Sequence, residues 1–230
     1  MMGATGHGQV RYLPLAILAS GVLLRPQPLL AQDRVEVGPL VGFFAPTTTF
    51  AGPLRMVPGS NNYTLNIAIA VGAEANIWLT PRVGLGALIG WSPSAVRQES
   101  ATLADTSLSA PVQLFGMFLA LKFNLSHLNG DVRARAGAGY LRHMGAAFAP
   151  YGHPGSLTGL VGIEATLPLR RALRLTGGLD AYLYSLQLTD TFGTRYEHRF
   201  QADLLARVGL MWVPGAHRVG ALMTSVARMP

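Results

Sequence analysis

Residues 65–80, with the sequence LNIAIAVGAEANIWLT, decide the fold of this chain. Apolar residues occupy every second position of this stretch: Leu65, Ile67, Ile69, Val71, Ala73, Ala75, Ile77 and Leu79. The positions between them include Asn66, Gly72, Glu74 and Asn76. A period of two belongs to a β-strand whose two faces meet different surroundings. We therefore predict a strand with one apolar face and one mixed face.

The same alternation recurs along the chain from residue 34 onward. It predicts eight strands, at residues 34–45, 64–80, 82–92, 112–125, 131–144, 156–168, 172–187 and 199–213. The connections after the second, fourth and sixth strands are short. The other four are long and rich in Pro, Gly, Ser and Thr, at residues 46–63, 93–111, 145–155 and 188–198.

This alternation of connection lengths is typical of outer-membrane barrels, which have short periplasmic turns and longer extracellular loops. The sequence therefore predicts an all-β fold, an eight-stranded antiparallel up-and-down transmembrane β-barrel. A soluble β-sandwich is the alternative, and it would not keep the long and short connections in such regular order.

The composition agrees with a membrane protein that has no transmembrane helix. The 230-residue chain is 50% hydrophobic and 13% charged, roughly half the charged share of a soluble domain. Its mean hydropathy is +0.31, yet it has no run of about 20 apolar residues. It has no cysteine, which excludes disulfides and Cys-ligated metal sites. The net charge is +7, but the basic residues are dispersed, which argues against nucleic-acid binding.

The N-terminal segment has the layout of a secretory signal peptide. Residues 1–12 are polar and contain Arg11, residues 13–24 form an apolar core (LPLAILASGVLL), and the small residue Ala31 follows. We expect residues 1–31 to be cleaved, residues 32–213 to form the barrel, and residues 214–230 to form a short C-terminal periplasmic tail. An uncleaved membrane anchor is the alternative, although a 12-residue helix rises only about 18 Å.

The charged residues of the strands fall mainly on the face opposite the apolar one. Parity set by the apolar positions places ten of them in the barrel lumen: Glu36, Glu74, Lys122, Arg133, Arg135, Glu164, Arg174, Asp180, Asp203 and Arg207. Only Arg142 falls on the lipid face within a strand. Paired charges persist in a narrow lumen where isolated ones would be costly. Arg135 and Glu164 lie at similar depth on neighbouring predicted strands, and so do Asp180 and Arg207. We therefore expect a lumen charge network that contains these two pairs. Solvated charges on a soluble sheet are the alternative.

Aromatic residues occur on both faces of the predicted strands, and their positions differ between the two faces. Those with lipid parity lie near strand ends, where interfacial girdles form: Phe43, Trp91, Phe115, Phe123, Phe200 and Trp212. Inward aromatic residues and the lumen charges would fill a barrel of eight strands. We therefore expect a plugged lumen rather than an open pore.

These features resemble the small OmpA/OmpX-type eight-stranded outer-membrane β-barrel family over about residues 34–213. The last strand contains Arg207-Val208-Gly209-Leu210-Met211-Trp212, which looks like the polar-x-Gly…aromatic signal read by the barrel-assembly machinery. The resemblance implies a monomer in the outer membrane of a Gram-negative-type bacterium. It also implies contact with outer-membrane lipid and lipopolysaccharide, and with the assembly machinery during biogenesis.

Known catalytic motifs are absent from the sequence. The six histidines form no HExxH pair, and there is no Gly-x-Ser-x-Gly elbow. We expect no catalytic residue, no metal and no cofactor, and a non-enzymatic structural or surface-binding role in the cell envelope. We expect the loop aromatic residues Phe50, Tyr151 and Phe192 to be exposed and to contribute to binding of an unknown extracellular ligand. The alternative is a lipid-modifying enzyme of the lipid A deacylase or acyltransferase type.

The signal-peptide interpretation predicts the N-terminus of the mature protein. N-terminal sequencing of protein purified from the cell envelope should begin at Gln32, or one or two residues later, because Ala31 is the small residue that precedes the cleaved bond. A sequence that begins at Met1 would contradict this interpretation.

Overall fold

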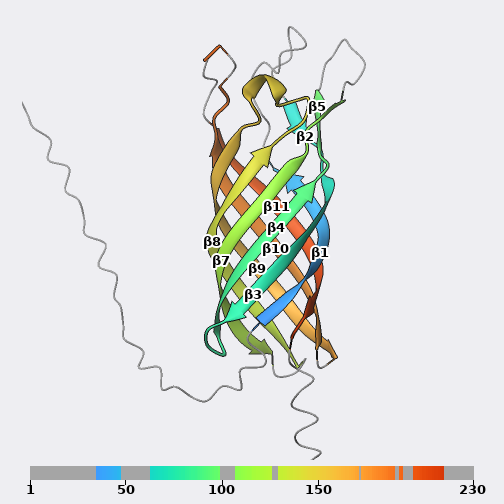
Figure 1. The fold of residues 1–230 in the computed structure, drawn as a ribbon, viewed down its shortest axis with the longest axis vertical. Coiled ribbons are helices and arrows are strands. Elements are labelled where there is room, and N and C mark those ends of the chain that lie inside the picture. The colour runs from blue at the N-terminus through green and yellow to red at the C-terminus, as the bar shows by residue number, and fades with distance from the viewer. Residues whose placement is uncertain are drawn as a thin grey trace, which may run out of the picture. The chain divides into compact units, whose positions relative to one another are not determined.

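Eight antiparallel strands close into a barrel in the spatial order β1-β11-β10-β9-β8-β7-β4-β3 (Figure 1). The computed structural model describes residues 35–47, 63–98, 107–125, 129–170, 172–189, 192–193 and 199–214. The barrel strands are β1 (Val35–Pro46), β3 (Ala68–Trp78), β4 (Val83–Ser92), β7 (Val112–Leu125), β8 (Gly130–His143), β9 (Gly155–Arg170), β10 (Leu173–Leu186) and β11 (Arg199–Trp212). The predicted fold class is confirmed. The expected signal peptide, and the expected tail beyond Pro214, lie outside the described residues.

The alternation in the sequence becomes an alternation of exposure. On β7, Met117 is 59% exposed whereas Leu114 is 3% exposed, and inward and outward residues alternate along this strand. Large apolar side chains also cover the outer wall on six of the other barrel strands, whereas the outward residues of β8 are mostly alanines, with Tyr140 near the loop end. So wide an apolar outer surface is unsuited to water and marks a membrane-facing wall. In the described part of the chain, no helix is long and apolar enough to cross a membrane.

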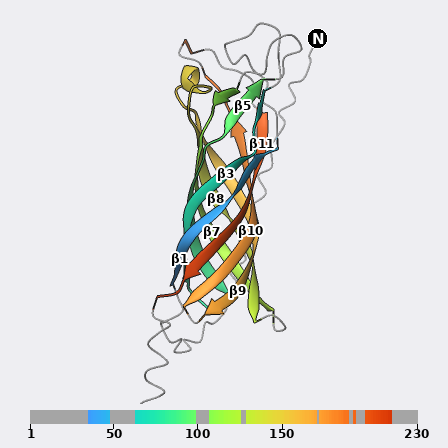
Figure 2. The same cartoon turned by 90° about the vertical axis from the view of Figure 1, so that its right-hand side faces the viewer.

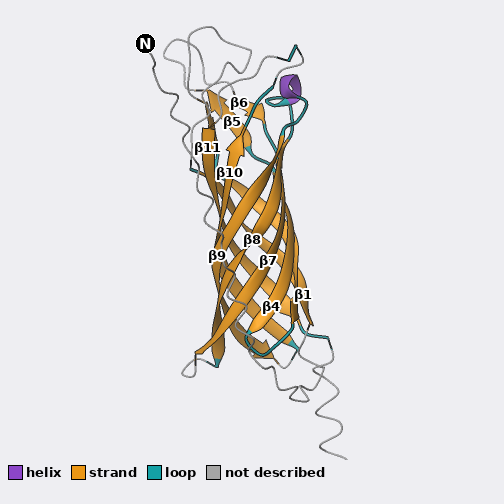
Figure 3. Cartoon of the chain, turned by 90° about the vertical axis from the view of Figure 1, so that its left-hand side faces the viewer, coloured by secondary structure: helices purple, strands orange, loops and turns teal. Residues whose placement is uncertain are grey.

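The predicted strand at 64–80 is wrong in one respect, because it is two strands. β2 (Tyr63–Leu65) precedes β3, and residues 66 and 67 separate them. The predicted loop at 93–111 contains two further short strands, β5 (Ala95–Gln98) and β6 (Ser107–Ser109). These three form a separate sheet in the order β2-β5-β6 at the loop end (Figures 1 and 3). Strands of three or four residues are too short for a period of two to reveal them.

Pairing of β1 with β11 closes the barrel, and the two strands run side by side in Figure 2. The register joins Val37 to Trp212 and Leu40 to Gly209, and it has no pair at Gly38 and Pro39. Proline has no N–H to donate, so it interrupts a ladder at its own position. On its other side, Pro39 is aligned with Ala73 of β3. The proline therefore costs one local contact and leaves the closure intact.

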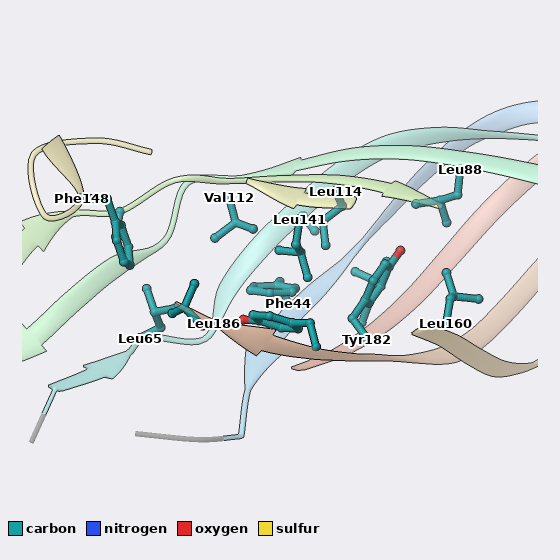
Figure 4. Packing of buried hydrophobic residues seen from close by; sticks show 14 of the residues in the cluster. Phe44, Leu65, Leu88, Val112, Leu114, Leu141, Phe148, Leu160, Tyr182 and Leu186 are labelled. Carbon is teal, nitrogen blue, oxygen red and sulfur yellow. The ribbon is translucent and has the colours of Figure 1, made fainter. Parts of the chain in front are cut away.

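The lumen half nearest the loops is packed with apolar side chains. Phe44, Leu114 and Leu141 are buried there together, and Phe148 covers them from the loop side (Figure 4). Phe148 precedes a short 3₁₀ helix, Ala149–Tyr151, in the loop between β8 and β9. Tyr151 was expected to be an exposed loop residue, which is wrong: it is 7% exposed and belongs to this core. Phe192 is exposed, and Phe50 lies outside the described residues.

The apolar outer wall predicts that an arginine placed on it destabilises the barrel by an amount that depends on its depth in the membrane. Leu119, in the middle of β7, and Leu169, next to the turn end of β9, are 53% and 56% exposed. We expect Leu119→Arg to destabilise the folded barrel by about 2–4 kcal/mol and Leu169→Arg by about 0–1 kcal/mol, because a charge is most costly at the bilayer midplane. Urea titration in phospholipid vesicles, followed by the heat-dependent gel mobility of the folded barrel, measures both. Equal costs would contradict a membrane-spanning position.

Candidate functional site: the charged lumen

The turn half of the lumen holds a continuous set of ion pairs that we call the lumen ion cluster. Its members come from β1, β3, β8, β9, β10 and β11, and each side chain points inward because of its parity on its strand. The cluster consists of Glu36, Glu74, Asp131, Arg133, Arg135, Glu164, Arg174, Asp180 and Arg207.

Arg133 organises the part of the cluster nearest the turns. Its guanidinium group donates to both oxygens of Glu36, at 2.7 and 3.1 Å, and its Nε donates to Asp131 at 2.6 Å. Its Nη1 also donates to Glu164 at 3.1 Å. Arg174 adds a second contact to Glu36 at 2.8 Å. Glu36 therefore receives two guanidinium groups, from β8 and from β10.

Arg135 and Arg207 organise the deeper part. Both contact the same oxygen of Glu74, at 3.0 and 2.9 Å. Both also contact Glu164 and Asp180, where the Nε of Arg207 lies 2.7 Å from the carboxylate and the Nη2 of Arg135 lies 3.5 Å away. Three carboxylates thus share two guanidinium groups.

Neutral groups complete the cluster. Asn76 donates to the second oxygen of Glu74 at 2.8 Å, and the guanidinium carbon of Arg135 lies 3.7 Å from the centre of the Phe118 ring. Glycine provides the space: a Cβ on Gly162 would lie 2.0 Å from an oxygen of Asp180. Asp180 can therefore take its position in the cluster only because the neighbouring strand carries glycine at that level.

The cluster has five carboxyl groups and four guanidinium groups, which is one acidic group more than the basic groups. The side chains of Arg133, Arg135 and Arg207 are each 1% exposed. Burying these charges costs several kcal/mol per ion, and close contacts repay the cost only while both partners are present. The arrangement is therefore chemically suited to holding the strands in one register and to blocking the lumen.

The structure places the two expected pairs in contact, Arg135 with Glu164 and Arg207 with Asp180. Lys122 lies inside the barrel but outside the cluster, because its ammonium group sits 3.8 Å from the centre of the Trp78 ring. Asp203 also lies apart, nearer the loops, where it accepts a hydrogen bond from Tyr184 at 2.7 Å. Asp131 was missed, although it shares the parity of Arg133 and Arg135, which was the available signal.

The six aromatic residues assigned to the membrane interfaces all lie exposed on the outer wall: Phe43, Trp91, Phe115, Phe123, Phe200 and Trp212. Their strand positions put Phe123 and Trp212 near the turns and the other four near the loops. Tyr140 joins the loop-end group, although the sequence analysis did not assign it there. Arg142 is exposed on the same wall, two residues beyond Tyr140.

Two of the six histidines fall within the described residues. His143 is completely buried, with its ring centre 4.9 Å from that of Phe148 and its Nε2 3.4 Å from the hydroxyl of Tyr184. His153 lies in the loop between β8 and β9, and its Nδ1 has no hydrogen-bond partner among the described residues. The described part of the chain contains no group of three or more His, Asp or Glu side chains arranged to hold a metal ion.

The shared contacts of Arg207 predict a large and specific stability loss. We expect Arg207→Leu to cost roughly 3–5 kcal/mol, because it leaves Asp180, Glu74 and Glu164 with Arg135 as their shared partner at this level. Adding Asp180→Leu should recover only part of the loss, since the two glutamates remain. Urea unfolding in detergent micelles measures each variant.

The matched control for this experiment is Arg142→Leu, which removes the same side chain from the exposed outer wall. We expect it to change the free energy of unfolding by no more than about 0.5 kcal/mol. A loss for Arg207→Leu that matches the control would show that the cluster contributes little to stability.

Comparisons with known proteins identify the fold. No protein-family model and no curated protein matches the chain. Among solved structures, the outer membrane protein OprG from Pseudomonas aeruginosa aligns with a TM-score of 0.54 and 9% identity over 79% of this chain and 96% of its own. The outer membrane protein AlkL aligns with a TM-score of 0.50 and 10% identity over 93% of this chain and 96% of its own. With the closed barrel and its apolar outer wall, these alignments show that the chain has the fold of the small eight-stranded outer-membrane β-barrels.

Proposed function

We propose that this protein is a non-enzymatic outer-membrane barrel with a closed lumen, which serves the cell envelope as a structural or surface-binding protein. The observation that carries the proposal is the contact between Arg133 on β8 and Glu36 on β1, at 2.7 Å. In the barrel order these two strands are four positions apart in either direction, so they face each other across the lumen. An ion pair between opposite walls leaves little space for solutes at that level.

The rest of the lumen supports the same conclusion. Eight strands enclose a space just wide enough to be filled by side chains. On the loop side of the lumen ion cluster, Tyr182 and Leu160 are buried in the lumen. Phe44 and Leu141 are buried nearer the loops. An ion that entered from the loop end would have to cross this apolar layer without water, which is costly. The charged layer and the apolar layer thus oppose conduction for different physical reasons.

The loop end offers the surface on which a binding role would depend. The β2-β5-β6 sheet continues from the loop ends of β3 and β4, since Ser94 and Ala95 both bond to Asn66. Main-chain bonds from Ala110 to Ser94 and from Ala147 to Ser109 join it to the following segments. This ordered platform could hold a binding surface in a fixed position, as a rigid scaffold does for functional loops.

The alternative function is modification of lipid A by a deacylase or an acyltransferase. Such an enzyme needs an activated nucleophile and a base that a lipid can reach. His143 is buried inside the barrel beside Tyr184 and Phe148, which puts it out of reach of lipid. The side-chain Nδ1 of His153 makes no hydrogen bond to a described serine or carboxylate. The described residues therefore favour the non-enzymatic role.

We also propose the partners that the outer surface would meet. Outer-membrane lipid would contact the apolar wall, and the phosphate groups of lipopolysaccharide would contact Arg142 near the loop-end aromatic residues. The final strand, which ends at Trp212, would be read by the barrel-assembly machinery. The apolar wall needs no second copy to cover it in a membrane, which supports a monomer.

The closed lumen predicts the electrical behaviour of the protein. After insertion of the purified protein into a planar lipid bilayer, we expect no sustained conductance, because charged and apolar layers both fill the lumen. Heat-dependent gel mobility of the same preparation serves as the control that the barrel is folded. A steady ohmic current from folded protein would contradict the closed lumen.

The same preparation separates the two functions. After incubation with lipid A and phospholipid, the acyl donor that a transferase needs, in mixed micelles, the mass of lipid A should be unchanged. A loss or gain of one acyl chain would contradict the non-enzymatic role and favour the alternative.

A further inference from the structure

A cavity of about 510 Å³ opens at the turn end of the barrel. It is lined by the turn-end residues of four neighbouring strands, β7, β8, β9 and β10. Its volume lies in the range of about 300–1,000 Å³ that small-molecule sites have. It borders the lumen ion cluster but lies outside its deeper part, so occupation would not require the ion pairs around Arg135 and Arg207 to open.

Two cations line the cavity from different sides. Lys122 comes from β7 and Arg174 from β10. Arg174 is the most accessible arginine of the cluster, with its side chain 21% exposed against 1% for Arg133. Lys122 contacts the Trp78 ring and pairs with no carboxylate among the described residues. Lys122 is partly exposed as well. Both side chains are thus more accessible to an anion than the buried arginines are, although Arg174 already pairs with Glu36 at 2.8 Å.

The surroundings of the cavity add positive charge. Arg82 and Arg170 are exposed at the same end. The carbonyl of Arg82 accepts a bond from the Lys122 N–H, and Arg170 is aligned with Leu173, next to Arg174. Asp131 is the one carboxylate among the residues that line the cavity. Arg174 and Asp131 belong to the lumen ion cluster, so the excess of positive charge at this end comes from Lys122, Arg82 and Arg170. A concave site with such an excess concentrates anions.

The neutral lining indicates what else the ligand carries. Asn124, Asn129 and Thr166 provide amide and hydroxyl groups around the cavity. The Asp131 oxygen that does not bind the Nε of Arg133 lies 4.0 Å from the Nη1 of Arg174 and can accept hydrogen bonds from a ligand. Amides, a hydroxyl and a carboxylate suit a ligand with several hydroxyl groups, whereas Lys and Arg suit a phosphate.

We propose that the turn-end cavity binds a small sugar phosphate, with the phosphate between Lys122 and Arg174 and the sugar hydroxyls on Asn124, Asn129 and Asp131. This site is at the opposite end from the surface-binding role proposed above. It requires neither that role nor a completely closed lumen, so the two proposals succeed or fail separately.

Trp78 provides a direct readout of binding. The chain has three tryptophans, so a ¹⁵N-labelled full chain in detergent micelles gives three indole N–H signals, and Trp78→Phe identifies the relevant one. Glucose 6-phosphate should shift the Trp78 signal saturably, because Lys122 lies over that ring. The signals of Trp91 and Trp212, which lie on the outer wall, should not move. Inorganic phosphate should bind more weakly, and glucose should cause no shift.

Variants test whether the positive charge of Lys122 is needed for glucose 6-phosphate binding. Lys122→Met keeps an unbranched side chain over Trp78 but removes the charge, and it should weaken glucose 6-phosphate binding roughly tenfold or more. Arg142→Met removes an exposed charge at the other end and should leave the affinity unchanged. The unmoved signals of Trp91 and Trp212 report that each variant is folded.

Three results would overturn the proposal. The first is no saturable shift at about 10 mM glucose 6-phosphate, a concentration above the weakest affinity expected of a specific site. The second is equal affinity in Lys122→Met and the unmodified chain. The third is inorganic phosphate binding as tightly as glucose 6-phosphate, which would leave the sugar without a role.

Discussion

Pairing of β1 with β11 is the contact on which the rest of this structure depends. In the hydrocarbon core of a membrane no water is available to an unpaired N–H or C=O group, and each such group costs several kcal/mol. An open sheet would expose two edges, whereas closure leaves none. The chain meets this requirement with a ladder from Val37 to Pro46 against Asp203 to Trp212, even with a proline in the first strand.

Closure with eight strands fixes the width of the lumen, and the width explains its contents. The space is too narrow for a water-filled channel and too wide to be left empty. Arginine is long enough to reach the opposite wall, as Arg133 does to Glu36. Side chains in so narrow a space also need small neighbours, as Gly162 shows beside Asp180. The ion pairs, the glycines and the apolar side chains near the loops are therefore all consequences of the narrow width of the lumen.

The two halves of the lumen differ in a way that bears on function. Near the loops, Phe44, Leu114 and Leu141 form a dry core that continues into the loop structure through Phe148. Near the turns, charged and amide groups line a cavity that a solute can enter. The described part of the loop end thus carries a three-stranded sheet beside an apolar core, and the turn end carries a polar cavity. This division supports separate proposals for the two ends of one barrel.

The sequence by itself determined the class of fold, the faces of the strands and most of the strand positions. It could do so because a period of two is a local property: Ile69 and Val71 point outward and Glu74 points inward whatever the neighbours are. The sequence also predicted two contacts between neighbouring strands, Arg135 with Glu164 and Arg207 with Asp180. Tertiary structure alone decided which charges meet across the lumen, because strand tilt and closure bring residues from opposite walls into contact. Alternation therefore placed Lys122 and Asp203 in the lumen, but only the closed barrel put Lys122 on Trp78 and Asp203 on Tyr184. The alternation in the sequence also could not reveal β2, β5 and β6, because such short strands are defined by their pairing with one another rather than by a pattern of their own.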